Sequence, residues 1–520
     1  MNRHVLAAIL LSGLMASATT HAGLTVAGVF SDHAVLQRGM PVPVWGTADP
    51  GVEVSVSFGS QTKSVMAGKD GAWRLKLDPL QAGGPGTMTI SADGEQAITI
   101  NEVLVGEVWV GSGQSNMAGG VGGYAKRDAT LAKLIEGAPY PKIRLLKGGP
   151  KPSWMEATPE TVPGFSAILF AFGERLHRDL DVPVGLIVGA VGGTPSGLWL
   201  SQDAFDRSEA CKAAVVESAK TYDEEKERKN FEAKLAAWKK QAAAAKEKGE
   251  KPRGRQPQPP KGPGECTRGT IGNLYEKFIR PVVGYGIRGV LWDQGESGTA
   301  VVGVDQYTLM GALISGWRRE WGQGEFPFIY VQKNSGGGVA FDPADPITRE
   351  ADAYTPPPAQ VPSTNGGRRL EFIRIMDYDG AHMVPASDLG SGVHPINKWG
   401  YGNRAAEVAM SVVYGKDLLA HGPRYQSHVV KGNAVHITFD NVGKGLTSRH
   451  GDGLTGFAIA GEDRKFVWAE ARIVGDTVVV SADAVEKPVA VRFGCAEKRT
   501  WANLFNKDGL PALAFRTDDW

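Results

Sequence analysis

Cysteine, net charge and long apolar runs are all scarce in this chain of 520 residues. Three cysteines are too few for a disulfide framework, and they lack the paired spacing of a zinc site, so a large core must supply the stability. The 57 basic and 56 acidic side chains leave a formal charge of +1, which gives no net field to gather nucleic acid or an anionic membrane. We therefore expect a small or neutral partner and neither a nucleic-acid nor a membrane partner.

The apolar run nearest the N-terminus is too short to cross a membrane. Polar residues at 2–4 precede the apolar stretch from Val5 to Met15, and small residues then lead to Ala22. The run is about ten residues long, whereas a membrane-spanning helix needs roughly twenty. Residues 1–22 are therefore predicted to be a cleavable secretory signal, and the mature chain is expected to be exported to the periplasm or secreted.

The chain has an unusual charged insertion at about 215–268, with Cys211 and Cys266 near its two ends. From Asp223 to Lys248 it is rich in Glu, Lys and Ala with a narrow apolar stripe, which predicts an exposed helix. The Pro/Gly/basic stretch at 251–264 has little to bury and is interpreted as a solvated spacer in preference to a basic arm that binds a partner. The two cysteines are either a bridge that closes this arm or separate buried thiols, and both alternatives stay open.

The apolar pattern divides the mature chain into three parts. Period-two alternation, as in Val52 to Phe58, predicts half-buried strands and a β-sandwich-like module over residues 23–104. Short apolar strands then alternate with helical stretches, which predicts an α/β domain with a parallel sheet over 105–425. Alternation returns after Lys431, so a C-terminal β module is expected over 426–520.

Five candidate strands and one helix define the predicted α/β domain. The strands are Glu107–Gly111, Val184–Val188, Gly289–Trp292, Phe328–Gln332 and Met383–Ser387. The stretch Phe165–Leu180 places apolar residues on one face at helical spacing.

A glycine-punctuated turn with a serine follows the first of these strands. The residues Gly-Gln-Ser at 113–115 stand where a parallel strand ends, and ligands bind at that edge of such sheets. Ser115 therefore becomes a candidate nucleophile, which needs a nearby base and free backbone N–H groups for an oxyanion. The Gly-x-Ser-x-Gly elbow is absent, because position 117 is Met.

His394 is the candidate base, because it follows the loop at the carboxyl end of the last predicted strand. That position puts its imidazole on the same sheet edge as Ser115, whereas His382 lies at the opposite end of the strand. The alternative role for His394 is to cap the helix expected near Asn397. The sequence contains no His-Glu-x-x-His helix, phosphate loop or dinucleotide fingerprint, and no metal or organic cofactor is expected.

Four ordered motifs resemble those of a known family. They are Ser-Gly-Gln-Ser-Asn-Met at 112–117, Gly-Gly-Thr-Pro at 192–195, Trp-Asp-Gln-Gly-Glu-Ser at 292–297 and Val-His-Pro-Ile-Asn-Lys at 393–398. With flanking stretches at 30–39 and 509–518, the chain resembles the sialate O-acetylesterase family of the SGNH hydrolases. The resemblance implies an SGNH-type, flavodoxin-like domain with three layers around a parallel sheet, flanked by β-sandwich-like modules.

The resemblance also implies a serine esterase mechanism. Ser115 would be the nucleophile and His394 its base, and the oxyanion hole would comprise the backbone N–H groups of Ser115 and Gly193 and the side-chain amide of Gln294. The alternative roles are a tight turn for Gly193 and a buried amide for Gln294. The implied substrate is an O-acetylated carbohydrate, either a sialic acid or a plant polysaccharide such as xyloglucan or xylan.

The sequence departs from the resemblance at the triad acid. Many SGNH hydrolases have an aspartate three residues before the histidine, where this chain has Ser391. Asp388 is the first candidate substitute, followed by Asp293 and Glu296, and a backbone carbonyl or a dyad without an acid remain open. For Glu296, a carboxylate that holds the sheet edge together is the favoured interpretation.

Two other function classes remain open at this level. One is a carbohydrate-binding or adhesion protein with a vestigial hydrolase domain, and the other is a hydrolase of longer acyl chains. Trp199, Trp292 and Trp399 near the motifs either stack on sugar rings or fill the core. The sequence leaves the identity of the carbohydrate and the oligomeric state open.

Overall fold

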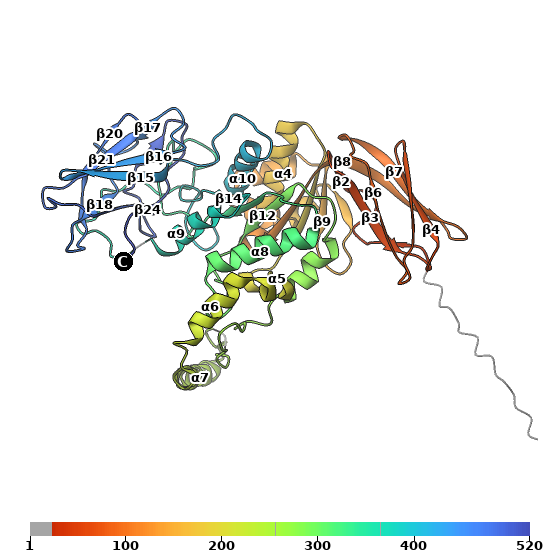
Figure 1. Ribbon diagram of the computed structural model, residues 1–520, viewed down its shortest axis with the longest axis horizontal. Helices are drawn as coiled ribbons and strands as arrows, with labels where there is room; N and C mark the ends of the chain where they lie inside the picture. Colours follow the sequence, from red (N-terminus) through yellow and green to blue (C-terminus); the bar gives the residue numbers. More distant parts are fainter. Residues whose placement is uncertain (1–22, 255, 365) are drawn as a thin grey trace, which may run out of the picture.

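The computed structural model describes residues 23–254, 256–364 and 366–520, and Figure 1 shows their arrangement. The predicted signal peptide at 1–22 lies outside these residues. No helix in the described ranges is both long and apolar enough to cross a membrane.

Short and mostly antiparallel strands form the N-terminal module. They are β1 (Thr25–Val26), β3 (Val42–Thr47) and β6 (Ala72–Leu77) in one sheet, with β2 (Val35–Gln37), β4 (Glu53–Phe58), β5 (Gln61–Met66) and β7 (Gly83–Ala92) arranged around the first half of β8 (Ile98–Gly113). Along β6 the side chains of Trp73, Leu75 and Leu77 are buried while their neighbours are exposed. The period-two pattern therefore predicted these half-buried strands correctly.

A parallel sheet forms the middle of the molecule. Its strand order is β10 (Trp154–Ala157), β9 (Tyr140–Lys147), β11 (Val184–Ala190), β8, β12 (Gly289–Asp293), β13 (Phe328–Val331) and β14 (Ala381–Val384). All neighbours pair in parallel except β10 and β9. The predicted mixed α/β class is confirmed, but β9 and β10 were missed and the last strand ends earlier than predicted.

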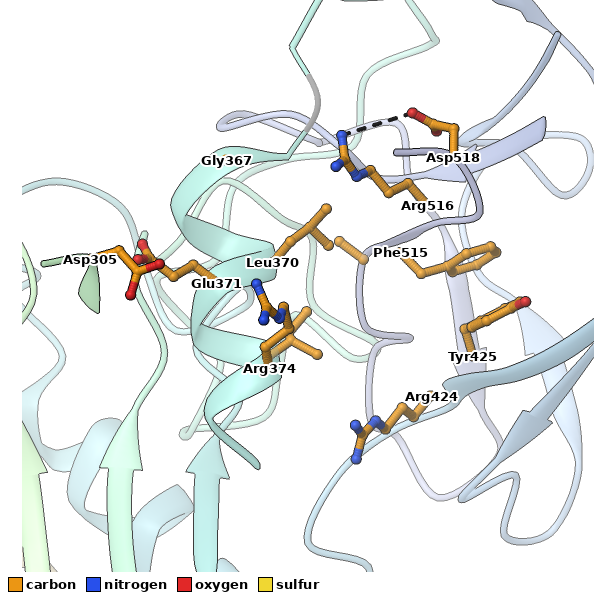
Figure 2. Close-up of a pocket in the computed structure, with 12 residues that line it drawn as sticks. Asp305, Gly367, Leu370, Glu371, Arg374, Arg424, Tyr425, Phe515, Arg516 and Asp518 are labelled. Atoms are coloured by element: carbon orange, nitrogen blue, oxygen red, sulfur yellow. Dashed lines mark ion pairs between the residues drawn. The ribbon is translucent and has the colours of Figure 1, made fainter. Parts of the chain in front are cut away.

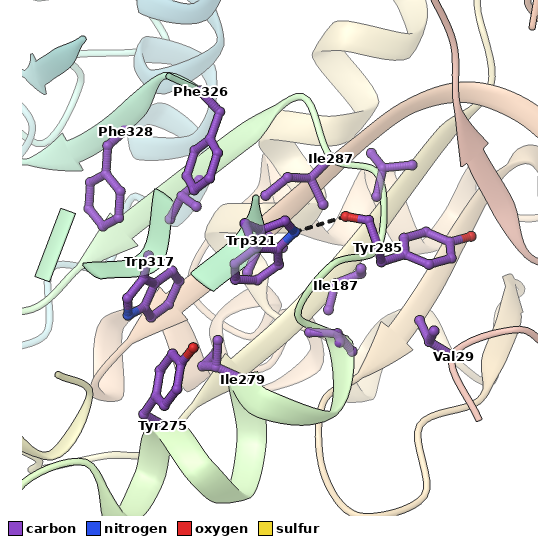
Figure 3. Close-up of a cluster of buried hydrophobic side chains, with 14 of the residues drawn as sticks. Val29, Ile187, Tyr275, Ile279, Tyr285, Ile287, Trp317, Trp321, Phe326 and Phe328 are labelled. Atoms are coloured by element: carbon purple, nitrogen blue, oxygen red, sulfur yellow. Dashed lines mark hydrogen bonds between the residues drawn. The ribbon is translucent and has the colours of Figure 1, made fainter. Parts of the chain in front are cut away.

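Alternate residues of the central strands pack on opposite faces of this sheet. Val108 and Val110 of β8 contribute to one apolar cluster, while Trp109 between them contributes to another. The second cluster includes α4 (Ala167–Leu180) and α10 (Lys398–Val412), which contact each other. The first cluster includes α8 (Gln306–Trp321), and Figure 3 shows Trp317 of this helix beside Phe328 and Trp321 beside Phe326.

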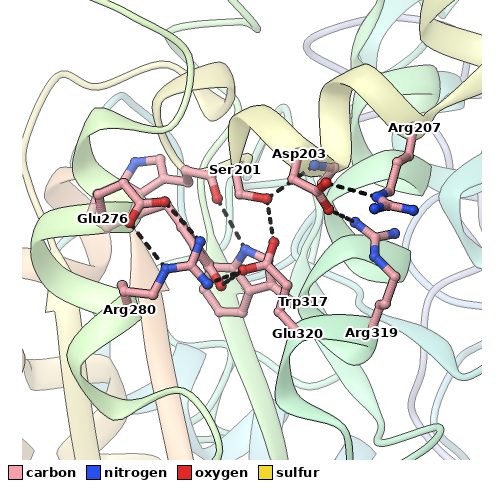
Figure 4. Close-up of polar contacts among 11 residues, drawn as sticks. Ser201, Asp203, Arg207, Glu276, Arg280, Trp317, Arg319 and Glu320 are labelled. Carbon is pink, nitrogen blue, oxygen red and sulfur yellow. Dashed lines mark hydrogen bonds and ion pairs between the residues drawn. The ribbon is translucent and has the colours of Figure 1, made fainter. Parts of the chain in front are cut away.

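A polar cluster centred on Glu320 joins α8 to its neighbours. The Glu320 carboxylate accepts hydrogen bonds from Ser201 and from the Arg280 guanidinium at 2.5 Å (Figure 4). It also accepts one from the Tyr275 hydroxyl at 2.6 Å. Ser201 also caps α5 (Gln202–Arg207), and Tyr275 begins the π-helical segment η3 (Tyr275–Ile279). These bonds fix the segments on either side of the charged insertion to one helix of the central domain.

The charged insertion projects from the molecule (Figure 1). After α6 (Glu209–Ala219), helix α7 (Glu224–Glu247) begins at the cap Asp223 and ends at Lys248, and none of its residues is buried. The predicted exposed helix is confirmed with its expected ends. Cys211, Cys266 and Cys495 are all free and buried, so the bridge considered between Cys211 and Cys266 is absent.

The C-terminal module packs ten short strands around its own apolar cluster. They are β15 (Arg424–Lys431), β16 (Ala434–Asp440), β17 (Leu446–Ser448), β18 (Phe457–Ala460), β19 (Val467–Trp468), β20 (Glu470–Val474), β21 (Thr477–Ser481), β22 (Ala490–Phe493), β23 (Leu504–Asn506) and β24 (Phe515–Arg516). A cavity of about 510 Å³ separates α9 (Gly367–Arg374) from Tyr425 and Phe515 (Figure 2). Its lining includes neither Ser115 nor His394.

Candidate active site

Ser115 is the first residue of the short helix α1 (Ser115–Ala118), directly after β8. The preceding Gly113 has a φ of +131°, and a Cβ there would lie 2.1 Å from the carbonyl oxygen of Asp293. Glycine is therefore required where β8 passes β12. The Gln114 N–H also donates to the Asp293 carbonyl at 2.9 Å, which fixes the turn that carries Ser115.

His394 lies on the loop between β14 and α10, and its imidazole meets Ser115. The distance between His394 Nε2 and Ser115 Oγ is 2.8 Å, although the two residues are 279 positions apart in the chain. Ser115 is half-buried and His394 is exposed, so the pair is open to solvent. The structure thus brings together the two residues that sequence reasoning placed at one sheet edge.

The loop after β11 lies beside the serine. A Cβ at Gly192 would lie 3.5 Å from Ser115 Cβ, and Gly193 is exposed with a φ of +70°. Arg268, which follows the charged insertion, donates to the Gly193 carbonyl at 3.0 Å. The N–H of Ser115 has no acceptor within its helix, because it belongs to the first turn. Backbone donors are therefore available around Ser115 for an oxyanion.

Gln294 has a different arrangement from the one predicted. Its side chain is fully buried, and its amide nitrogen donates to the carbonyls of Thr194 at 3.3 Å and Gly298 at 3.0 Å. Its N–H groups are therefore occupied by backbone carbonyls and do not fit the oxyanion role. The amide instead ties the loop after β11 to the loop after β12, which was the alternative interpretation.

Asp388 does not contact the imidazole either. Its carboxylate is fully buried and accepts hydrogen bonds from both terminal nitrogens of Arg404, at 3.3 and 3.0 Å. Within the described ranges, no hydrogen bond joins Asp388 to His394, whose one side-chain bond is to Ser115. The predicted role of Asp388 as orienting acid does not fit this geometry, because Arg404 binds both of its oxygens.

A buried polar network supports the turn that carries Ser115. Glu296 accepts hydrogen bonds from Gln114 Nε2 at 2.5 Å and Asn116 Nδ2 at 2.9 Å, the residues on either side of Ser115. Lys333 lies 2.8 Å from Glu296 and 2.7 Å from Asp293. Glu296 therefore holds the sheet edge together, which agrees with its favoured interpretation.

Burial and the central lysine determine the charges of this network. Burial raises the pKa of Glu296, but the Lys333 ammonium outweighs this effect and the net pKa is lowered. For Asp293 burial prevails over Lys333, and the pKa is raised. Burial alone would lower the pKa of Lys333, yet the two carboxylates raise it. Lys333 and Glu296 therefore form an ion pair at neutral pH.

Sequence reasoning assigned no role to Asn116 or Lys398, although both belong to the quoted motifs. The Lys398 ammonium donates to Asn116 Oδ1 at 2.6 Å, and Asn116 Nδ2 donates to the Val393 carbonyl at 3.1 Å. Asn116 thereby joins the helix that carries Ser115 to the residue before His394. Burial lowers the pKa of Lys398 to about 7. The sequence signal for Lys398 was its place at the first position of the helix that follows His394.

The three tryptophans near the motifs divide into two groups. Trp199 and Trp292 are fully buried and contact each other with ring centroids 6.4 Å apart, so they fill the core and do not stack on a sugar. Trp399 is half-buried. In the part of the chain that the structure describes, no group of three or more His, Cys, Asp or Glu side chains could hold a metal ion.

Comparison with known proteins finds relatives over most of the chain, although no protein-family model matches it. It is 27% identical to a sialate O-acetylesterase of Rattus norvegicus over 464 residues, which cover 80% of this chain and 79% of that protein. The Homo sapiens protein of the same name is 27% identical over 79% of this chain and 75% of its own length.

A solved structure agrees with these relatives. A carbohydrate acetylesterase from Xanthomonas citri superposes with a TM-score of 0.71 at 27% identity, over 95% of this chain and all of that one. The predicted resemblance to sialate O-acetylesterases is confirmed, and so is the prediction that the chain is an esterase.

Proposed function

We propose that this esterase, a relative of the sialate O-acetylesterases, removes O-acetyl groups from a carbohydrate through an acetyl-enzyme on Ser115. The observation that carries the proposal is the 2.8 Å separation of Ser115 Oγ and His394 Nε2 at the carboxyl edge of the parallel sheet. A serine becomes a nucleophile when a base within hydrogen-bonding distance accepts its proton.

Two acyl transfers make up the proposed reaction. His394 Nε2 accepts the Ser115 proton as Oγ attacks the acetyl carbonyl, and the imidazolium then protonates the departing sugar oxygen. Water gives a proton to His394 as it attacks the acetyl-enzyme, and the imidazolium returns this proton to Ser115 Oγ as the ester bond breaks. Acetic acid leaves and ionises to acetate. For this sequence Nε2 must be unprotonated at the start, so neutral His394 carries its proton on Nδ1.

Backbone donors stabilise the negative charge that develops on the carbonyl oxygen. The proposed donors are the N–H groups of Ser115, at the start of α1, and of Gly193, on the neighbouring loop after β11. The loss of one such donor typically costs about 10²–10³ in rate. Gln294 contributes indirectly, since its amide fixes the loop that carries Gly193.

The proposed catalytic unit is a dyad that the Asn116 network orients. Asn116 fixes the Val393 carbonyl, and with it the backbone next to the imidazole. Asp388 has an indirect role, because its ion pair with Arg404 anchors the start of the loop that carries His394.

The wider assignments are proposals of the same kind. The three-layer domain over 105–425 is proposed to be of the SGNH type, with β modules over 23–104 and 426–520. Export after cleavage near Ala22 would place the enzyme in the periplasm or outside the cell. The relatives' names give sialic acid or another acetylated carbohydrate as the substrate.

Hydrolysis of p-nitrophenyl acetate by purified protein tests the proposal. Ser115→Ala should reduce kcat by at least about 10⁴ while circular dichroism stays unchanged. Ser218→Ala, which removes a hydroxyl from helix α6, is the matched control and should retain activity. Turnover that survives in Ser115→Ala would exclude this mechanism, and rates that rise with acyl length beyond acetyl would identify a longer-chain hydrolase instead.

A further inference from the structure

A cavity of about 440 Å³ adjoins the Ser115–His394 pair, and the acetyl-transfer steps leave it without a role. Its lining includes Val393, the neighbour of His394, and Glu296, which bonds to both residues that flank Ser115. A ligand whose acetyl group reaches Ser115 can therefore extend into this cavity. Volumes of this size are typical of small-molecule sites.

Three chain segments meet at the wall of the cavity with their backbones in contact. A Cβ at Gly336 would lie 2.4 Å from the Gly390 carbonyl oxygen, and one at Gly337 would lie 2.4 Å from the Glu497 carbonyl oxygen. The Arg499 N–H donates to the Gly337 carbonyl at 2.6 Å. Loops after β13 and β14 and a segment of the C-terminal module thus form one close-packed wall.

A buried arginine locks the C-terminal segment to the sheet loops. Arg369 is 2% exposed, and one of its terminal nitrogens donates to the carbonyls of Gly336 and Glu497, each at 3.0 Å. The guanidinium lies behind the wall, while the Glu497 side chain is exposed on the cavity side. The backbone that carries this carboxylate is therefore held in place by the fold.

The side chains that reach the cavity are mainly hydrogen-bonding groups. Asn334 Nδ2 donates to Glu497 Oε1 at 3.1 Å, and the Ser391 hydroxyl and the Gly337 N–H both donate to Asp352 Oδ2. A carboxylate has lone pairs for further donors, so both acids can still accept ligand hydroxyls. No ion pair within the described ranges neutralises Asp352 or Glu497, and Lys498 is the one cation of the lining.

We propose that this cavity is a subsite for the neutral sugar units that adjoin the acetylated unit, with Asp352 and Glu497 as specificity-determining residues. Sugar hydroxyls donate to the two carboxylates, whereas a sugar that bears a carboxylate would bring like charges into contact. The substrate class is then an acetylated neutral oligosaccharide or polysaccharide. This inference rests on the proposed function, because it places the acetyl group at Ser115.

Steady-state kinetics on three substrates test the subsite in the full chain. They are p-nitrophenyl acetate, which has no sugar, O-acetylated neutral xylo-oligosaccharides of increasing length, and an O-acetylated sialoside. For the wild type, kcat/KM should rise with chain length until the cavity is filled, and the neutral substrates should be preferred over the sialoside.

Two substitutions of Glu497 separate hydrogen bonding from charge. Glu497→Gln should lower the ratio of kcat/KM for the oligosaccharide to that for p-nitrophenyl acetate by roughly tenfold. Glu497→Lys should raise the sialoside-to-oligosaccharide ratio of kcat/KM by roughly tenfold. Glu486→Gln removes an exposed acid from the same module outside the cavity and should leave both ratios at the wild-type value.

The outcomes distinguish this inference from the function on which it rests. The subsite alone is overturned if turnover of p-nitrophenyl acetate depends on Ser115 but kcat/KM does not rise with chain length. Wild-type ratios in both Glu497 variants would overturn it in the same way. A preference of the wild type for the sialoside overturns its neutral character. Turnover that does not depend on Ser115 overturns the proposed function itself.

Discussion

Both carboxylate oxygens of Asp388 bond to Arg404 in the core, where neither side chain is more than 4% exposed. The removal of one partner from such a pair leaves a buried charge without compensation, which typically costs about 3–5 kcal/mol. The carboxylate therefore contributes to stability, whereas a triad acid that orients the imidazole contributes about 10⁴ in kcat.

Asp388→Asn should accordingly lower the free energy of unfolding by about 3–5 kcal/mol. Its kcat for p-nitrophenyl acetate, measured well below the unfolding temperature, should fall by much less than 10⁴-fold. Denaturant unfolding and initial rates provide the two readouts, and Arg404→Met should show the same pattern from the other side of the pair. Wild-type stability combined with a loss near 10⁴ would restore Asp388 as the orienting acid.

Lys398 should make the stability of the folded protein depend on pH. Its pKa is lowered from 10.5 to about 7 because the ammonium is buried, with Tyr124 and Tyr401 rings beside it. Between these two pH values the unfolded chain binds more protons at this site than the folded chain does. Stability from this group therefore rises as the pH goes from 7 towards 10.5, and the charging penalty is complete below pH 7.

Lys398→Met should remove that rise. The difference in unfolding free energy between wild type and variant, followed from pH 6 to pH 10, should move in favour of the wild type by up to about 1.4 kcal/mol per pH unit above 7. The variant should also have a lower kcat, because Asn116 loses the donor that aligns it with the Val393 carbonyl. A difference in stability that does not vary with pH would show that the ammonium does not titrate in this window.

Secondary-structure elements with a strong period were predictable, and those without one were not. The candidate strands at 184, 289 and 328 begin at the observed residues, because each is a short apolar run bounded by turn residues. Strand β9 was missed since Pro141, Lys142 and Arg144 interrupt its apolar pattern. The last strand was predicted two residues late, because the buried segment continues beyond the paired one.

The candidate site was likewise predictable only in part. Ser115 and His394 were predictable because strand ends and their loops converge at one edge of a parallel sheet. The partners of Asp388 and Gln294 were not, since Arg404 lies on the following helix and the Thr194 and Gly298 carbonyls belong to separate loops. Sequence spacing places residues at an edge but does not determine which way each side chain turns.

Helix α7 projects from the rest of the fold. None of its residues is buried, and its ion pairs, such as Arg228 with Glu232 at 2.7 Å, lie within the helix. The ends of the insertion come back together, because a Cβ at Gly264 would lie 3.2 Å from the Val215 side chain. Exposed pairs of this kind contribute only about 0.3–0.5 kcal/mol each.

Replacement of residues 222–261 by a short glycine-serine linker should therefore leave the protein folded and active. The thermal midpoint should shift by less than about 4 °C, and kcat for p-nitrophenyl acetate should stay within about twofold of the wild type. Arg268 lies outside the deleted segment and keeps its bond to Gly193. A collapse of kcat with unchanged thermal stability would show that the helix acts on the site.

At the scale of the whole molecule, β8 joins the N-terminal module to the central sheet and to the turn that carries Ser115. It pairs with β7 in the N-terminal module and then with β11 and β12 in the central sheet before it ends at Gly113. Midway along it, buried Glu107 pairs with Arg38 at 2.6 Å and Arg288 at 2.7 Å. One strand thus fixes the turn that carries Ser115, while the C-terminal module supplies Glu497 to the lining of the cavity.

The central claim is that Ser115 is a nucleophile activated by His394. Labelling with a serine-directed fluorophosphonate, followed by peptide mass mapping, tests it most directly, because the reagent reacts only with an activated serine. We predict one label per chain, located on Ser115, absent in Ser115→Ala and slowed by at least about 10²-fold in His394→Gln. Labelling at another serine, or at an undiminished rate without His394, would contradict the claim.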